Sequence, residues 1–266
     1  MGATISEPGS GRELESLLEL RSVSKTFGDG ENQLEVLRDI TLNVSGGQFV
    51  SIVGPSGCGK STMFNIITGQ EPLSSGEVLF NGEPALDQRS NFAFMPQKDL
   101  LVPWRNVIDN TTIGLEIQGM PKAKAREKAK PLFGLFGLAG FEKNYPWMLS
   151  GGMRQRAALL RTVVQDRRVL LLDEPFGALD SLTRTEMQEW IADVWEQLRW
   201  TVLLITHDIR EAIYLSDRIY VLSARPGSIS LMVNVELPRP RDFESTLTPE
   251  FLELETTLLK ALHGFS

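Results

Sequence analysis

Apolar and polar positions divide the opening part of the chain into short strands. They alternate over residues 18–23, which predicts a strand with one face in solvent. Similar runs at 34–37 and 40–44 predict two further strands. Two glycines then turn the chain into a mainly apolar, β-branched run at 49–53. We therefore expect an antiparallel layer that leads into a buried strand.

A helical stretch interrupts the strand pattern in the middle of the chain. Strand-like runs stop near residue 99 and resume near residue 165. Helices are expected at 107–118, 122–136, 186–198 and 249–262, and further strands at 77–80, 91–97, 168–173, 201–206 and 219–222. Strands that alternate with helices favour a mainly parallel sheet. The pattern thus predicts an α/β fold with an N-terminal antiparallel β layer and an inserted helical subdomain at about 98–165.

Composition sets the domain organisation and excludes some partners. The 266 residues, 42% hydrophobic and 23% charged, suffice for one large domain. We expect it at 18–237, after a mobile tail at 1–17 and before a C-terminal extension at 238–266. The formal net charge of −7 gives no overall attraction to nucleic acid, so no nucleic-acid partner is expected. The Lys- and Arg-rich run at 122–130 is expected to be a solvated helix face.

The sequence favours a cytoplasmic protein that does not itself span a membrane. No apolar run approaches the roughly 18 residues that a spanning helix needs. The single cysteine, Cys58, cannot form an internal disulfide, and no signal-like apolar segment opens the chain. Residues 1–6 fit the loose N-myristoylation pattern, but that pattern is short and a chance match is expected.

A glycine-rich loop follows the buried strand at 49–53. Its residues, which match the phosphate-loop pattern G-x-x-x-x-G-K-[ST], are Gly54, Pro55, Ser56, Gly57, Cys58, Gly59, Lys60 and Ser61. The glycines let backbone N–H groups converge on one anion, and the following helix adds its free N-terminal donors. Lys60 would reach the β- and γ-phosphates of ATP, Ser61 would ligate Mg²⁺, and Thr62 would support the phosphates. We therefore expect a phosphate-loop NTPase core.

Other candidate site residues stand at the ends of elements. Asp173 and Glu174 follow a buried strand, at the edge where open α/β sheets place their ligands. His207 ends the strand at 201–206. Phe27 has a ring that could stack on a purine base, and core packing is an equal alternative. Ser150, Gly151 and Gly152 open a helix, either as a plain N-cap or as a second anion site.

Together these motifs resemble the ATP-binding subunit of ABC transporters, from about residue 18 to 223. The most specific stretch is similar to the ABC signature and reads Leu149-Ser150-Gly151-Gly152-Met153-Arg154-Gln155-Arg156. Met153 stands where the family commonly has Gln. The resemblance implies that the signature of one protomer closes on the γ-phosphate held by the phosphate loop of another, and that the chain is an active ATPase.

The resemblance also assigns roles to individual residues. Gln97 would contact Mg²⁺ or the attacking water, and Asp173 would hold Mg²⁺ through water. Glu174 would act as the general base that polarises the attacking water, and His207 would contact the γ-phosphate. Asp180 would belong to the D-loop at Gly177-Ala178-Leu179-Asp180.

Two stretches, 97–107 and 222–227, resemble importers of nitrate, taurine, aliphatic sulfonates and related small solutes. The implied assembly is a homodimer or a pair with a paralogous ATPase, beneath two transmembrane permease subunits at the cytoplasmic face of the membrane. A separate extracytoplasmic solute-binding protein would deliver the solute. The first stretch would line the groove for the permease's coupling helix.

Two alternatives are a soluble ABC ATPase of DNA repair, translation or iron-sulfur assembly, and an unrelated phosphate-loop NTPase such as a kinase. Repair types carry long heptad insertions, and translation types usually carry two cassettes; the sequence has neither. A kinase would lack Gln97 and the signature-like segment.

The thiol of Cys58 lies within the phosphate loop. The nearby Lys60 and helix N-terminus are expected to favour its thiolate, and bound ATP to shield it from reagents. The alternative is a thiol buried against the strand and inert with or without nucleotide.

Overall fold

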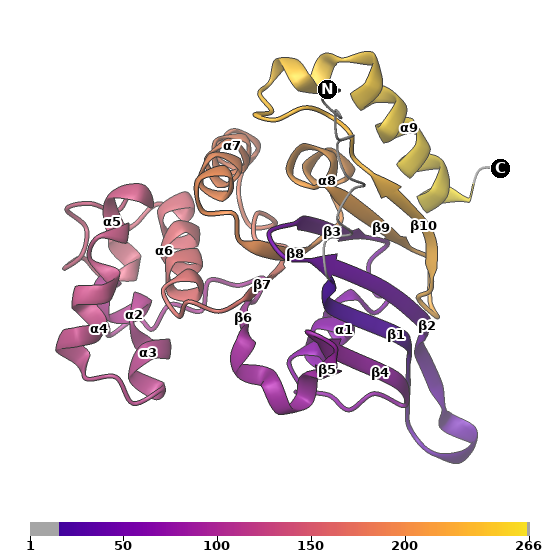
Figure 1. The fold of residues 1–266 in the computed structure, drawn as a ribbon. Helices are drawn as coiled ribbons and strands as arrows, with labels where there is room; N and C mark the ends of the chain where they lie inside the picture. Colours follow the sequence, from indigo (N-terminus) through magenta and orange to yellow (C-terminus); the bar gives the residue numbers. More distant parts are fainter. Residues whose placement is uncertain (1–15, 265–266) are drawn as a thin grey trace, which may run out of the picture.

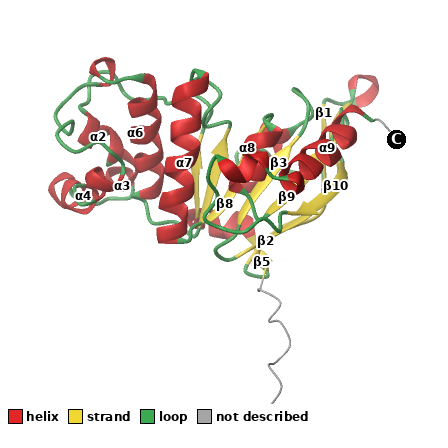
Figure 2. Ribbon diagram, turned by 90° about the horizontal axis from the view of Figure 1, so that it is seen from above, coloured by secondary structure: helices red, strands yellow, loops and turns green. Residues whose placement is uncertain are grey.

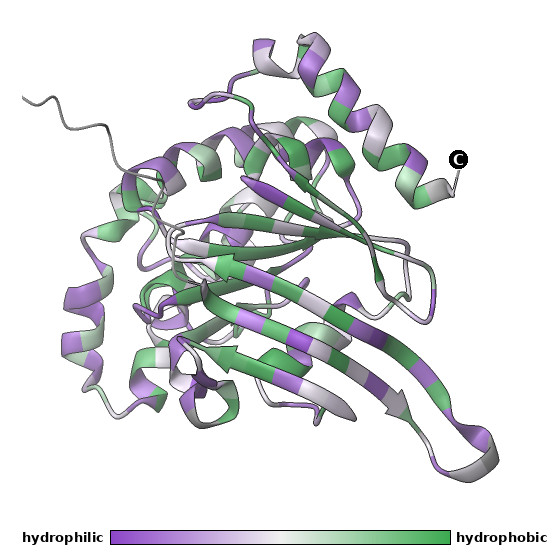
Figure 3. Cartoon of the chain, turned by 45° about the vertical axis from the view of Figure 1, so that its right-hand side comes forward, coloured by the Kyte–Doolittle hydropathy of each residue, from purple (hydrophilic) through white to green (hydrophobic). Residues whose placement is uncertain are grey.

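The computed structural model describes residues 16–264, so the predictions for residues 1–6 and for most of the tail at 1–17 lie outside the described residues. The first sheet is antiparallel, in the order β2-β1-β4-β5. Its strands are β1 Ser16–Phe27, β2 Leu34–Ser45, β4 Ser75–Phe80 and β5 Glu83–Pro84. Apolar and polar residues alternate along much of β1 and β2 (Figure 3), which buries one face of the sheet.

One prediction for this sheet was wrong in detail. The stretches 34–37 and 40–44 are parts of one continuous strand, β2. The residue between them, Asp39, has a φ of 49°, and the register with β1 shifts nearby. An irregularity of this kind bends a strand without ending the pairing. Strand β1 also begins at Ser16, two residues before the expected start of the domain.

The second sheet is mainly parallel, in the order β10-β9-β3-β8-β7-β6. Its strands are β3 Phe49–Val53, β6 Phe92–Met95, β7 Val169–Asp173, β8 Thr201–Thr206, β9 Arg218–Leu222 and β10 Ile229–Asn234. All neighbours run parallel except the pair of β9 and β10. Every residue of β3, β7 and β8 is buried, because both faces of the sheet are covered. This confirms the predicted fold class.

Helices α1, α7, α8 and α9 belong to the sheet-containing part, and helices α2 to α6 gather at the other end of the molecule (Figures 1 and 2). Their bounds are α1 Lys60–Ile67, α2 Val107–Thr111, α3 Ile113–Ile117, α4 Lys122–Ala129, α5 Leu132–Leu135, α6 Gly151–Val163, α7 Ser181–Leu198, α8 Ile209–Leu215 and α9 Pro249–His263. Short 3-10 turns lie at Gly30–Asn32, Ala85–Asn91, Pro146–Met148 and Glu244–Leu247. Within residues 16–264, no helix is both long and apolar enough to cross a bilayer.

Two helices expected in the helical part are each broken. The stretch 107–118 is interrupted at Thr112, where the hydroxyls of Thr111 and Thr112 both donate to the Ile108 carbonyl. Such side-chain bonds compete with the regular helix pattern. The stretch 122–136 is interrupted before Leu132 by Pro131, which has no N–H to continue the ladder.

The basic run on α4 is the solvated face that the sequence predicts. Its two buried side chains are Ala125 and Ala129. Lys122 and Arg126 each form an ion pair with Asp109, at 2.8 and 2.7 Å. These contacts fasten α4 to α2.

The C-terminal extension packs closely on the sheet-containing part. Phe251 and Leu258 of α9 are fully buried. Arg241 is also buried, and its Nη1 donates to the carbonyls of Ile213 (2.8 Å) and Ser216 (2.7 Å) at the end of α8. The Tyr214 hydroxyl donates back to the Arg241 carbonyl at 2.7 Å. The extension is therefore hydrogen-bonded to the helix that follows His207.

Candidate functional site

The phosphate loop lies between β3 and α1, as the sequence predicts. Gly59 has a φ of 107°, and a Cβ there would lie 2.6 Å from the Leu37 side chain. Only glycine fits this position. No side chain caps the N-terminus of α1, so its first backbone N–H groups are not used by a capping residue. The loop and helix together form a cradle that suits a phosphate group.

Lys60 and its neighbours line a cavity of about 500 Å³. Its wall consists of Phe27, Leu34, Val36, Ser56, Gly57, Gly59, Lys60, Ser61, Thr62, Gln97, Glu174 and Arg225. The Lys60 ammonium donates to the carbonyls of Gly54 (2.7 Å) and Pro55 (3.0 Å). These two bonds keep the lysine side chain against the loop.

Phe27 belongs to the cavity wall and is not a core residue. Its side chain is 36% exposed. The Lys25 ammonium lies 4.5 Å from the centroid of its ring, so that one ring face is already covered. A flat base would therefore stack on the opposite face.

The two acids at the end of β7 differ in environment. Asp173 is buried, and its burial raises the pKa of the carboxyl group, while a hydrogen bond from the Ser61 hydroxyl and the charge of Lys60 oppose that rise. Glu174 has a φ of 45°, which is rare for a residue with a side chain. Its Oε2 accepts a hydrogen bond from Gln97 Nε2 at 3.1 Å and lies 3.3 Å from His207 Nδ1. Three predicted residues thus meet at one carboxylate oxygen.

The donor set beside the cavity fits Mg²⁺. Ser61, Asp173 and Gln97 offer a hydroxyl, a carboxylate and an amide oxygen, which are the hard ligands that this ion prefers. A cation there would offset the cost of burying the Asp173 carboxylate. Within residues 16–264, no cluster of three or more His, Cys, Asp or Glu side chains is arranged to hold a metal ion alone. The ion would therefore rely on nucleotide phosphates and water for its remaining ligands.

The signature-like segment lies outside this cavity. Ser150 is the N-cap of α6, and its Oγ accepts a hydrogen bond from the Met153 N–H at 3.3 Å. Asp180 caps α7 in the same way, accepting from the Thr183 N–H at 3.1 Å. A Cβ at Gly152 would lie 2.9 Å from Thr183, so the two helix starts pack closely. The fold brings Ser150, Gly151, Gly152 and Asp180 together, but not with Lys60.

Comparisons with known proteins agree with this geometry. Residues 37–177 match the ABC transporter family. An uncharacterized ABC transporter ATP-binding protein of Methanocaldococcus jannaschii is 42% identical over 245 residues, 92% of this chain and 91% of that protein. This chain belongs to the ABC transporter family. The aliphatic sulfonates import ATP-binding protein SsuB of Bacillus cereus is 41% identical over 238 residues, 90% of this chain and 92% of that protein.

Solved ABC structures share the fold. A dimeric ATP-binding cassette in a post-hydrolysis state, bound to ADP and Pi, is 30% identical with a TM-score of 0.70, over 85% of this chain and 100% of that one. The cbiO1 protein of Clostridium perfringens, part of the ABC transporter complex cbiONQ, has a TM-score of 0.75 at 22% identity, over 94% of this chain and 98% of that one. The second comparison bears on the fold alone.

Two arginines of α6, the helix that the signature-like segment opens, hold the loop that follows Gln97. Arg161 donates to the carbonyls of Asp99 (2.7 Å) and Leu100 (2.9 Å). Arg154 Nε donates to the Asp99 carboxylate at 3.3 Å, and its Nη1 donates to the Leu149 carbonyl at 2.9 Å. The glutamine loop and the signature helix are therefore joined by side-chain bonds. Local sequence patterns give no signal of this connection, since its partners lie more than fifty residues apart.

The prediction of a reactive thiol at Cys58 is wrong. The residue is only 1% exposed, and its Sγ lies 3.0 Å from the position of a Cβ at Gly54. Burial raises the pKa of the thiol, and this outweighs the opposing charges of Lys60 and Arg225. Cys58 contributes its backbone to the loop while its side chain packs in the core, which is the alternative considered from the sequence.

Arg225 and Gly227 also contact the phosphate loop, and neither was predicted from the sequence. Arg225 lines the cavity and contacts the phosphate loop. A Cβ at Gly227 would lie 2.2 Å from the Cys58 carbonyl oxygen, so the backbone of this segment rests directly on the loop. The motif Arg225-Pro226-Gly227 could have pointed to them, but in the sequence it indicated only a resemblance to importers.

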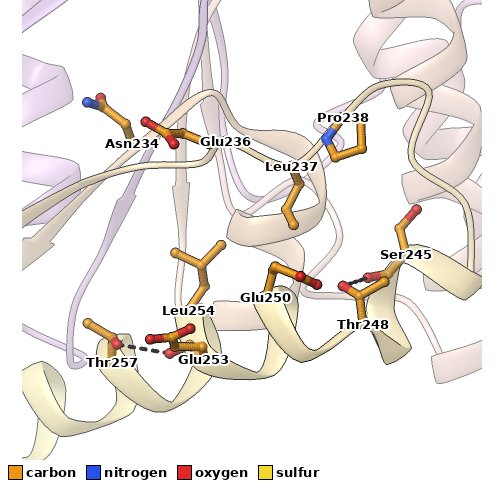
Figure 4. Close-up of a pocket in the computed structure, with 10 residues that line it drawn as sticks. All are labelled: Asn234, Glu236, Leu237, Pro238, Ser245, Thr248, Glu250, Glu253, Leu254 and Thr257. Carbon is orange, nitrogen blue, oxygen red and sulfur yellow. Dashed lines mark hydrogen bonds between the residues drawn. The ribbon is translucent and has the colours of Figure 1, made fainter.

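Another groove, of about 680 Å³, lies between α9 and the segment after β10 (Figure 4). Leu237 and Leu254 reach into it from its two sides, and Glu236, Glu250 and Glu253 line it. None of the predicted site residues lies there. Its acidic lining would repel phosphates.

Proposed function

We propose that this chain is the ATP-hydrolysing subunit of an ABC importer for a small solute of the nitrate, sulfonate or taurine kind. The observation that carries the proposal is the contact of Gln97 and His207 with one oxygen of Glu174, at the edge of the cavity lined by Lys60. This arrangement holds a carboxylate where it can accept a proton from an attacking water. The likeness to SsuB, named as an aliphatic sulfonates importer, supports the solute class.

Each residue then has a defined task in hydrolysis. The loop N–H groups and Lys60 bind the phosphates of ATP, and Phe27 stacks on the base. Ser61, Asp173 and Gln97 would hold Mg²⁺, which would neutralise charge on the phosphates. Glu174 takes the proton of the attacking water, and His207 contacts the γ-phosphate.

A second copy, or a paralogous ATPase, completes the site. Ser150, Gly151 and Gly152 present a helix N-terminus that lies outside the cavity of their own chain. The dimeric arrangement of a 30%-identical cassette bound to ADP and Pi supports the same arrangement here, with the signature of one protomer on the phosphates of the other. Asp180 would lie at this shared surface, next to the signature.

The helical part provides a surface for two permease subunits. Trp104 is 78% exposed and Leu100 is 60% exposed, and both follow Gln97 before α2 begins. Their exposure within one loop, directly after Gln97, supports a contact surface there. The chain would thus sit peripherally at the cytoplasmic face of the membrane, with an extracytoplasmic solute-binding protein on the other side. No observation favours an ABC ATPase uncoupled from transport.

The test compares wild type with two variants. Glu174→Gln should bind ATP normally but lose at least about 100-fold in turnover, about 2.7 kcal/mol of barrier, because an amide cannot accept the proton. Lys60→Ala should lose ATP affinity itself. Normal hydrolysis by Glu174→Gln would refute the base assignment. Co-purification of the tagged chain with permease subunits from a membrane extract tests the transport role, and recovery without any membrane protein would refute it.

A further inference from the structure

The side chain of Arg225 reaches across the fold to the phosphate loop. It lies between β9 and β10, yet its Nε and Nη2 donate to the carbonyl oxygen of Gly57 at 3.1 and 2.8 Å. Arg225 also lines the cavity that contains Lys60 and Phe27. A guanidinium has five N–H donors, and these two bonds use only two of them.

The remaining donors of Arg225 are free to meet a ligand. Over residues 16–264, the structure contains no ion pair between Arg225 and a carboxylate, and its Nη1 donates no hydrogen bond. By contrast, the Lys60 ammonium donates to two carbonyls of the loop. Arg225 therefore places an unpaired positive charge beside a cradle whose shape suits a phosphate.

The backbone that carries Arg225 is fixed in place. The Gly227 N–H donates to the Val36 carbonyl, and the Gly227 carbonyl accepts from the Arg38 N–H, both at 2.9 Å. The N–H of Ser223 donates to the Ser228 carbonyl at 2.9 Å, and this bond closes the turn that contains Arg225 and Gly227. Because both ends of the segment are bonded, the arginine is held at the cavity before any ligand arrives. Such preorganisation lowers the cost of binding.

We propose that Arg225 is a nucleotide-binding residue that fixes the phosphate loop through Gly57 and donates its free N–H groups to the phosphates of ATP. The inference rests on the proposed function, because it assumes that ATP occupies this cavity. Guanidinium groups suit this task, since their planar donors match phosphate oxygens and always carry charge. The segment after β9 thereby becomes part of the nucleotide site.

Substitutions at position 225 can separate the charge from the loop contact. Arg225→Ala removes both, Arg225→Gln keeps a shorter, neutral donor, and Arg225→Lys keeps the charge without the planar donors. Arg21→Gln is the matched control: it also removes one arginine charge, but Arg21 pairs with Glu19 and Glu77 on the antiparallel sheet. Each protein's affinity for ATP, ADP and AMP is measured by displacement of a fluorescent nucleotide, at low and high salt.

Arg225→Ala should weaken ATP binding about tenfold, as expected for a charge-assisted hydrogen bond in a partly exposed site. The loss should be smaller for AMP, and it should shrink at high salt because salt screens the interaction. Arg225→Gln should bind as weakly as Arg225→Ala, Arg225→Lys should recover part of the affinity, and Arg21→Gln should match wild type. Thermal melting without nucleotide, unchanged among the variants, shows that each is folded.

Two results would overturn the inference. Equal ATP affinity of Arg225→Ala and wild type would exclude a phosphate contact. Full affinity of Arg225→Gln would reduce the residue to a support for the loop. Wild type and Lys60→Ala separate these outcomes from failure of the proposed function. If wild type itself binds no ATP, the proposed function is wrong. If wild type binds ATP and the affinity is lost in Lys60→Ala but not in Arg225→Ala, only the role of Arg225 is refuted.

Discussion

Glu211 should make the stability of this protein depend on pH. The residue lies on α8, four positions after His207, and is only 4% exposed. Burial, together with the charge of Asp208, raises the pKa of its carboxyl group from an ordinary 4.5 to about 8, against the opposing effect of hydrogen bonds from Thr206 and Gln188. Arg184 is the facing cation, and its charge lowers the pKa only in part.

The sign of the effect follows from proton binding in the two states. Between pH 4.5 and about 8 the folded protein keeps a proton on Glu211 that the unfolded chain has lost. The free energy of unfolding therefore falls as pH rises through this window, by at most about 1.4 kcal/mol per pH unit. Across the whole window the loss amounts to about 5 kcal/mol. Below pH 4.5 the carboxyl is neutral in both states and adds no pH dependence.

Glu211→Gln replaces the carboxyl by a neutral amide of the same shape, so this part of the pH dependence should disappear. Urea unfolding of both proteins at pH 5, 6, 7 and 8 gives the difference in free energy at each pH. The free energy of unfolding of the variant should increase steadily relative to that of wild type as pH rises. Glu253→Gln, at an exposed position on α9, is the control and should follow wild type. Parallel curves for Glu211→Gln and wild type would show that Glu211 is ionised in the folded protein.

Three further predictions concern the nucleotide cavity. Cys58 should resist maleimide in the folded protein with or without Mg-ATP and react fully in urea, as intact-mass measurements would record; rapid labelling of the native chain would contradict its burial. Phe27→Ala should weaken ATP binding by roughly 1 kcal/mol through lost stacking, and unchanged affinity in a displacement titration would place the base elsewhere. Gly227→Ala should lower both thermal stability and ATP affinity, because its Cβ would lie 2.2 Å from the Cys58 carbonyl, whereas Gly46→Ala, with open space around it, should change neither.

Local sequence patterns predicted the elements that carry the chemistry. The phosphate loop depends on neighbours within a few residues, and so does the placement of Asp173 and Glu174 at the end of β7. The breaks at Thr112 and Pro131 also have local causes, and closer attention to side-chain bonding and proline would have found them. These errors left the site unaffected.

Contacts between distant parts of the chain could not be predicted in this way. Arg225 and Gly57 are 168 residues apart and meet only because β9 lies next to β3 in the sheet. The burial of Glu211 likewise depends on how α8 packs against α7, which supplies Gln188, and Arg241 is buried against the carbonyls at the end of α8. The same limit explains the wrong prediction for Cys58. Its neighbours in sequence indicated a stabilised thiolate, but the thiol is buried in a core that forms from distant parts of the chain, and this burial raises its pKa.

The bonds from Arg241 to the carbonyls after α8 also bear on how relatives of this protein can be recombined. A chimera joined at residue 238 would separate one guanidinium from the carbonyl oxygens of Ile213 and Ser216, which it now satisfies. Buried acceptors without donors would then remain next to the helix that follows His207. A junction ahead of α8 would exchange the helix and the extension as one unit. The unit that can be exchanged intact at this end of the chain therefore begins at the start of α8, well inside the fold and not at residue 238.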